Sequence, residues 1–165
     1  MFYFTHTVIT QFEAASVEKA VRRFSAKRYT SLDLSPSSSL IQEEKYFLGL
    51  ENNDTLSITR IRTPFERLIP KIVLSFKKEA HFKTYRTRLS LFTFIAFIFI
   101  ALGFADSLYY AVADYSFDAG LISSTLLLAG FAGLVLLEMK ITGMKLNKAV
   151  SRTIEAETVM TAAET

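Results

Sequence analysis

The sequence has no cysteine and no tryptophan, and only two histidines and three prolines occur among its 165 residues. Without cysteine, neither a disulfide framework nor a thiolate-bound metal ion is possible. Two histidines are too few for a histidine-rich metal site. The chain also lacks a glycine-rich phosphate loop and a Ser-His-Asp arrangement. We therefore expect no catalytic residue, no metal site and no cofactor, and a protein that is not an enzyme.

Basic residues are missing from the whole of residues 89–139. Within this stretch, residues 89–105 and residues 119–137 carry no charge of either sign. A helix needs roughly 20 apolar residues to cross a hydrocarbon layer about 30 Å thick, and each segment gains roughly 3–6 kcal/mol on insertion. The remaining chain is too short to cover two helices that are apolar on every side. The pattern predicts a transmembrane helical hairpin with a tight turn at residues 114–118.

Charge around the hairpin predicts its orientation. Lys and Arg precede and follow it, whereas the turn holds two Asp and no basic residue. The positive-inside rule then places both termini in the cytoplasm and the turn outside. We expect a multi-pass protein of the cell's inner (cytoplasmic) membrane, with the lipid bilayer as its first partner. No recognisable nucleic-acid-binding module accompanies the basic excess, so we expect no nucleic-acid partner.

Residues 1–88 show alternating strand patterns and one helical stripe. Residues 2–9, 45–50, 55–62 and 70–76 predict strands, and a helix is expected to open at Thr10 and to close at Lys27 and Arg28. Residues 79–88 suit either a strand or a basic extension of the first membrane helix, and Thr84, Tyr85 and Thr87 favour the strand.

The predicted fold class is α+β: a small antiparallel sheet with one packed helix, followed by a transmembrane helical hairpin and a short C-terminal helix. We divide the chain into a cytosolic α+β domain at residues 1–88, the hairpin at 89–139, and an interfacial helix with a frayed tail at 140–165.

Three short patterns carry a family resemblance: Tyr46-Phe47-x-Gly49, Leu56-x-Ile58-x-Arg60 and Pro70-x-Ile72. Together with the hairpin, they resemble a group of small bacterial membrane proteins in which a strand-rich cytosolic domain precedes a two-helix membrane hairpin. This chain departs from the group's pattern at residues 63–67, where a more polar run is usual, and in having no glycine after Ile72. The resemblance implies the architecture and transfers no active site.

Asp106, directly after the first apolar segment, is the charged residue nearest to the membrane interior, and intramembrane acids are functional candidates. It lies roughly 26 Å along the helix from residue 89, at about 1.5 Å per residue. That depth favours an interfacial cap over an ion pathway. Glu138, beside Lys140 at the inner end of the second segment, is expected to be solvated.

Two further sets of residues suggest contacts. Small residues let membrane helices approach closely, and the second segment has a small-residue face for packing within the hairpin or against a partner: Ala129, Gly130, Ala132 and Gly133. Basic residues near an anionic leaflet are attracted to lipid headgroups, and those before the hairpin are candidates for such contact or for a plain topogenic role: Arg60, Arg62, Lys77, Lys78, Arg86 and Arg88.

These features favour a non-catalytic accessory or scaffold subunit whose hairpin docks on an integral membrane protein or on a second copy. The alternative is a membrane-anchored regulator whose basic cytosolic domain senses anionic lipid or another anionic ligand. An enzyme acting on a membrane substrate is a remote third possibility.

Overall fold

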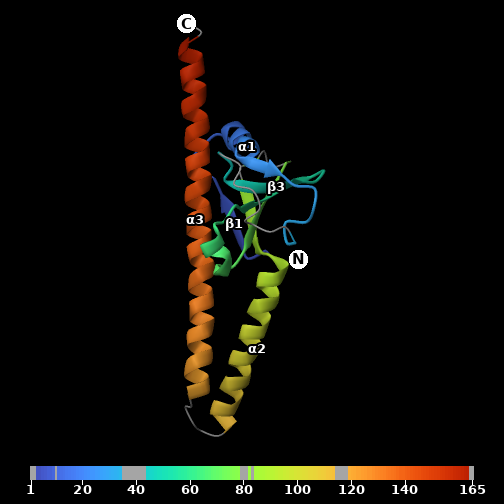
Figure 1. Cartoon of the computed structure of the whole chain (residues 1–165), viewed down its shortest axis with the longest axis vertical. Coiled ribbons are helices and arrows are strands. Elements are labelled where there is room, and N and C mark those ends of the chain that lie inside the picture. The colour runs from blue at the N-terminus through green and yellow to red at the C-terminus, as the bar shows by residue number, and fades with distance from the viewer. Residues whose placement is uncertain are drawn as a thin grey trace.

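The computed structural model of the chain describes residues 3–9, 11–34, 44–78, 82, 84–113 and 119–163, without the side chains of residues 6, 67 and 161–163. The predicted turn at residues 114–118 and the helix start at Thr10 lie outside the described residues. A long helix runs the length of the molecule, with a sheet domain beside one half of it and a second helix beside the other half (Figure 1).

Six strands form one sheet in the order β1-β6-β5-β4-β3-β2. All neighbours are antiparallel except β2 and β3, which run parallel. The predicted α+β class is confirmed, and residues 84–89 are a strand rather than a helical extension. The strand bounds are β1 Thr5–Val8, β2 Ser25–Lys27, β3 Phe47–Glu51, β4 Thr55–Arg60, β5 Ile72–Lys77 and β6 Thr84–Leu89.

Helix α1 spans Ala14–Arg23 and buries one face against the sheet. Its fully buried residues Val17, Ala20 and Val21 recur at three- and four-residue spacing, which places them on one side of a helix. The helix ends earlier than the sequence predicts. Residues 25–27 leave it to form β2, because backbone pairing with β3 offers them a place at the sheet edge.

Two helices are long and apolar enough to cross a membrane: α2, Leu91–Ala113, and the first part of α3, Ala119–Ala163. Helix α2 has no buried residue. The two helices touch through stacked rings of Phe97 and Phe131, whose centroids lie 5.8 Å apart. Most of the side-chain surface of α2 therefore faces whatever surrounds the molecule.

Helix α3 continues without a break for 45 residues, about 67 Å at 1.5 Å per residue. Its second half packs beside α1 on the sheet, where Leu146, Ala149 and Val150 are buried in the main core. The structure thus differs from the sequence prediction here. The C-terminal helix is not a short, separate interfacial element, because its apolar stripe covers sheet surface that α1 alone leaves open.

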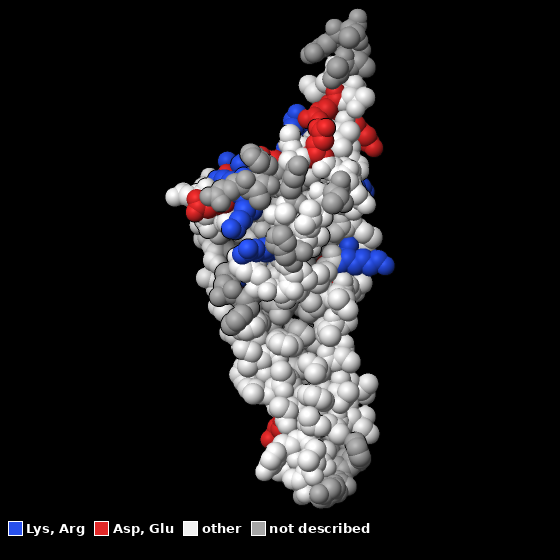
Figure 2. All heavy atoms as spheres, turned by 180° about the vertical axis from the view of Figure 1, so that it is seen from behind, with Lys and Arg blue, Asp and Glu red and all other residues white. Residues whose placement is uncertain are grey.

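Charged residues are distributed unevenly along the length of the molecule. In the space-filling view, Lys, Arg, Asp and Glu gather over the sheet domain and the C-terminal half of α3, whereas the hairpin surface is almost free of them (Figure 2).

Candidate functional site

Two arginines of β4 and the loop after it point into the core. Side chains alternate along a strand, so Arg60 follows the buried Leu56 and Ile58 onto the core face. Arg62 lies two residues further on. Arg60 is 3% exposed and Arg62 is 4% exposed, so both guanidinium groups require buried partners.

Glu138 of α3 supplies the main partner, and it is fully buried. Its Oε2 accepts a hydrogen bond from Arg60 Nη2 at 2.8 Å, and its Oε1 accepts from Arg60 Nε and Arg62 Nη2, both at 3.2 Å. The expectation that Glu138 is solvated is wrong. Sequence neighbours suggested exposure beside Lys140, but the sheet brings two buried arginines to this helix turn.

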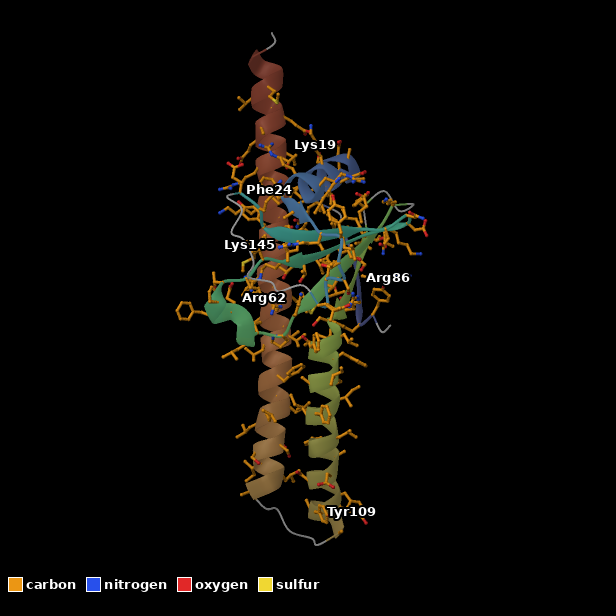
Figure 3. The ribbon with its side chains drawn as sticks, turned by 45° about the vertical axis from the view of Figure 1, so that its right-hand side comes forward. Lys19, Phe24, Arg62, Arg86, Tyr109 and Lys145 are labelled. Carbon is orange, nitrogen blue, oxygen red and sulfur yellow. The ribbon has the colours of Figure 1, made fainter. Side chains whose placement is uncertain are left out.

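A short 3-10 helix, η1, Pro64–Leu68, completes the cluster. Its Glu66 Oε1 accepts from Arg60 Nη1 at 2.7 Å. Arg62 also donates to the backbone carbonyls of Ile69, at 2.5 Å, and Pro70, at 2.9 Å. We call Arg60, Arg62, Glu66 and Glu138 the Glu138 joint. Two positive and two negative groups balance within it, and Figure 3 shows Arg62 beside α3.

Burial and pairing act in opposite directions on the ionisation of this joint. Burial acts to lower the pKa of Arg60, but Glu138 and Glu66 outweigh it and raise that pKa. At Arg62, burial prevails over the attraction of Glu138 and lowers the pKa. Burial acts to raise the pKa of Glu66, yet hydrogen bonds from Thr63 and Arg60 hold it below its ordinary value. The fold therefore pairs these charges at a desolvation cost, which makes each one dependent on its partners.

A second ion pair holds the start of α2. Arg88, the penultimate residue of β6, makes two hydrogen bonds to Asp33, at 2.9 and 3.1 Å. The same carboxylate accepts the backbone N–H of Leu91, the first residue of α2, at 3.0 Å. A carboxylate at a helix N-terminus satisfies a free donor and favours the helix dipole. We call Asp33, Arg88 and Leu91 the Asp33 joint.

Burial has the largest single influence on the pKa of Asp33 and on that of Lys71, which lies near the Asp33 joint. It acts to raise the pKa of Asp33, but hydrogen bonds from Arg88 and Leu91 prevail and lower it. Burial, together with the positive charge of Arg62, lowers the pKa of Lys71 to about 8. The Lys71 ammonium donates to the backbone carbonyl of Leu32, so the loop over this end of the sheet is held as well.

The six basic residues predicted to contact lipid divide into two groups. Arg60, Arg62 and Arg88 are buried and lie in the ion pairs of the two joints. Lys78 pairs with Glu51 at 2.9 Å, Lys77 is exposed, and Arg86 lies 5.6 Å over the ring of Tyr3. Lys77 is the last residue of β5 and Lys78 follows it, at the end of the strand far from α2, because Ile72, at the other end, pairs with Leu89. The six residues are therefore not gathered at one surface.

On the hairpin, the small-residue face does not serve close packing between α2 and α3. Ala129, Gly130, Ala132 and Gly133 are all exposed, and a methyl group added at Gly130 or Gly133 meets no atom within 4 Å. Asp106 is exposed near the far end of α2, whose last turns carry Tyr109 (Figure 3).

The sequence analysis did not predict the contact of Arg60 and Arg62 with Glu138 of α3, although one feature of the sequence could have indicated it. Arg60 and Arg62 share a strand face with Leu56 and Ile58, and a charge that continues a core-facing pattern requires a buried counter-charge. No group of three or more metal-ligating side chains occurs within the described part of the chain.

Comparison with known proteins yields no relative: no family model, no curated protein and no solved structure matches this chain.

Proposed function

We propose that this chain is a non-catalytic integral membrane protein, an accessory or scaffold subunit whose hairpin docks on a membrane partner or on a second copy. Its sheet domain would lie against the cytoplasmic surface of the inner membrane, with both termini on that side. The observation that carries the proposal is the Glu138 joint, which couples the sheet domain directly to a helix suited to span a bilayer.

The membrane placement is supported by where charge begins. Residues 119–137 are uncharged, and Glu138 follows them with both carboxylate oxygens bound by the sheet domain. The basic residues lie on the same side of the hairpin as this joint, as expected for a cytoplasmic face.

Two joints tie the sheet domain to the hairpin at separate points. The Glu138 joint holds α3, and the Asp33 joint holds the first residue of α2. A domain attached through a single flexible linker would rotate freely, but two separate attachments, of which the Glu138 joint is buried, favour one orientation. Whatever the hairpin binds would thereby set the position of the sheet domain.

The outward face of α3 supports docking. Ala129 and Gly133 are four residues apart and lie about 180° and 140° round the helix from Glu138, at 3.6 residues per turn. Both are exposed, and the stacked Phe97 and Phe131 form the hairpin contact elsewhere. Two small residues at this spacing allow another membrane helix to approach closely.

The alternative of anionic-lipid sensing has less support. Three of its six candidate residues, Arg60, Arg62 and Arg88, are buried and already have carboxylate partners, and the partner of the first two, Glu138, is itself fully buried. A headgroup would have to displace those partners, which would leave a buried carboxylate unpaired.

Because the chain has no native cysteine, a single Gly133→Cys variant can carry a thiol-linked photo-crosslinker in native membranes. We expect one stoichiometric adduct, with a mass of either two copies or one copy plus a single partner. Leu127→Cys is the control: it is exposed on the same helix about 120° away. Equal, diffuse labelling from both positions, or none from Gly133→Cys, would contradict the docking face.

A further inference from the structure

Two large apolar side chains of η1 point away from the protein. Phe65 is 94% exposed and Leu68 is 90% exposed, although η1 lies within the sheet domain rather than in the hairpin. A solvated connection between two strands would ordinarily carry polar residues here. The exposure is not due to a loose segment, because the intervening Glu66 accepts hydrogen bonds from the backbone and hydroxyl of Thr63.

The height of η1 along the molecule is set by α3. Glu66 binds Arg60, and Arg62 binds the carbonyls of Ile69 and Pro70 just after η1. Both arginines also bind Glu138, which follows the uncharged residues 119–137. The middle of η1 and the two residues just after it are therefore attached, through the arginines, to the point on α3 where the apolar segment ends.

The connection after η1 is tied to α2 at the same level. The N–H of Lys71 donates to Thr93 Oγ1 in the first turn of α2, and the N–H of Ser90 donates to the carbonyl of Lys71. In Figure 1, the green η1 lies beside α3 at the level where α2 begins. One short element thus lies between the start of the first apolar segment and the end of the second.

We propose that η1 is a membrane-inserting element, with Phe65 and Leu68 entering the interfacial layer of the cytoplasmic leaflet. This rests on the proposed placement of the hairpin in a bilayer. The occupant is phospholipid, because η1 continues the exposed apolar surface of the hairpin at the depth where headgroups meet acyl chains. Apolar side chains that lie in this layer are removed from water without a protein partner.

The absence of native tryptophan makes the depth of each site measurable with one substitution at a time. Phe65→Trp reports on η1. Phe99→Trp, at a 71% exposed position of α2, reports on the bilayer interior. Val159→Trp, also exposed, lies about 32 Å beyond Glu138 at 1.5 Å per residue and reports on the aqueous side. The purified full-length variants are reconstituted into phosphatidylcholine vesicles that contain brominated lipid.

We expect Phe65→Trp to be quenched most by lipid brominated near the headgroup and to be shielded from aqueous acrylamide. Phe99→Trp should be quenched most by lipid brominated deep in the chain, and Val159→Trp by acrylamide alone. Leu68→Trp should repeat the Phe65→Trp result. Because both η1 positions are exposed, the substitutions leave the core intact.

Quenching of Phe99→Trp without quenching of either η1 variant would overturn the inference and leave the hairpin in the membrane. Phe65→Trp that is shielded from acrylamide but unquenched by lipid would also overturn it, since a second copy of the chain would then cover η1. Phe99→Trp that no brominated lipid quenches would instead overturn the proposed membrane placement.

Discussion

The two halves of α3 share one continuous helix but differ in what they bury. Over residues 119–137, Leu121 is the one buried residue. From residue 138 onward, burial recurs every three or four residues, at Glu138, Thr142, Leu146, Ala149, Val150 and Thr153. A helix in lipid has no reason to hide its leucines, whereas a helix in water must bury an apolar stripe. Glu138 stands at the boundary between the exposed apolar half and the half that packs on the sheet domain.

Removing the charge at that boundary should have the largest effect. Glu138→Gln leaves Arg60 and Arg62 buried without their shared carboxylate, and breaking a buried pair in this way costs about 3–5 kcal/mol. We expect a clear drop in the thermal midpoint of the full chain in mild detergent. Glu155→Gln, exposed on the same helix, is the control. Equal midpoints for the two variants would show that the joint contributes little.

The same truncation in each half of α3 tests the comparison directly. Leu146→Ala empties a buried position beside α1 and should lower the free energy of unfolding by about 2–5 kcal/mol. Leu126→Ala, at a 68% exposed position, should change it by less than about 0.5 kcal/mol. Denaturant titration followed by circular dichroism measures both. Similar losses would mean that the first half is also packed against protein.

The Asp33 joint should contribute less to stability at acidic pH. Because the pKa of Asp33 is lower in the fold than in the unfolded chain, its stabilisation is present above the ordinary value and is lost as pH falls through the folded value. Asp33→Asn should cost about 1.5–3 kcal/mol near neutral pH and flatten the acid side of the stability profile. Asp54→Asn, at an exposed turn position, should leave that profile unchanged. A wild-type acid slope in Asp33→Asn would contradict this.

The smallest effect is expected at Lys71, and it falls on the alkaline side of the stability profile rather than on the acid side. Its folded pKa of about 8 lies below the ordinary 10.5, so between these values the unfolded chain retains a proton that the folded chain has lost. Stability attributable to Lys71 therefore rises with pH across this window. Lys71→Met should reduce the rise in midpoint from about pH 8 to pH 10, whereas the exposed Lys77→Met should retain it.

The pattern of apolar and polar residues along the chain predicted much of the fold. Alternation predicted the strands at residues 47–51, 55–60 and 72–77 closely, and Thr84, Tyr85 and Thr87 identified β6. The edge strand β2 was not foreseen, because three residues after a helix carry too little pattern and gain their structure from pairing with β3. Within the candidate site, the sequence pattern singled out Arg60 and Arg62, but it predicted that they contact lipid headgroups rather than a buried carboxylate.

The amino-acid sequence alone determined the two apolar helices, the strand-rich first part and the separation of charge from the hairpin. Each of these follows from residues that are neighbours along the chain. Only the tertiary structure decided that α3 is one continuous helix with an exposed apolar half and a packed half, and that Glu138 meets Arg60 and Arg62. Those arginines lie 78 and 76 positions away in the sequence, and no local preference specifies such a contact. It forms because the folded sheet leaves two buried guanidinium groups that a carboxylate on the covering helix must satisfy.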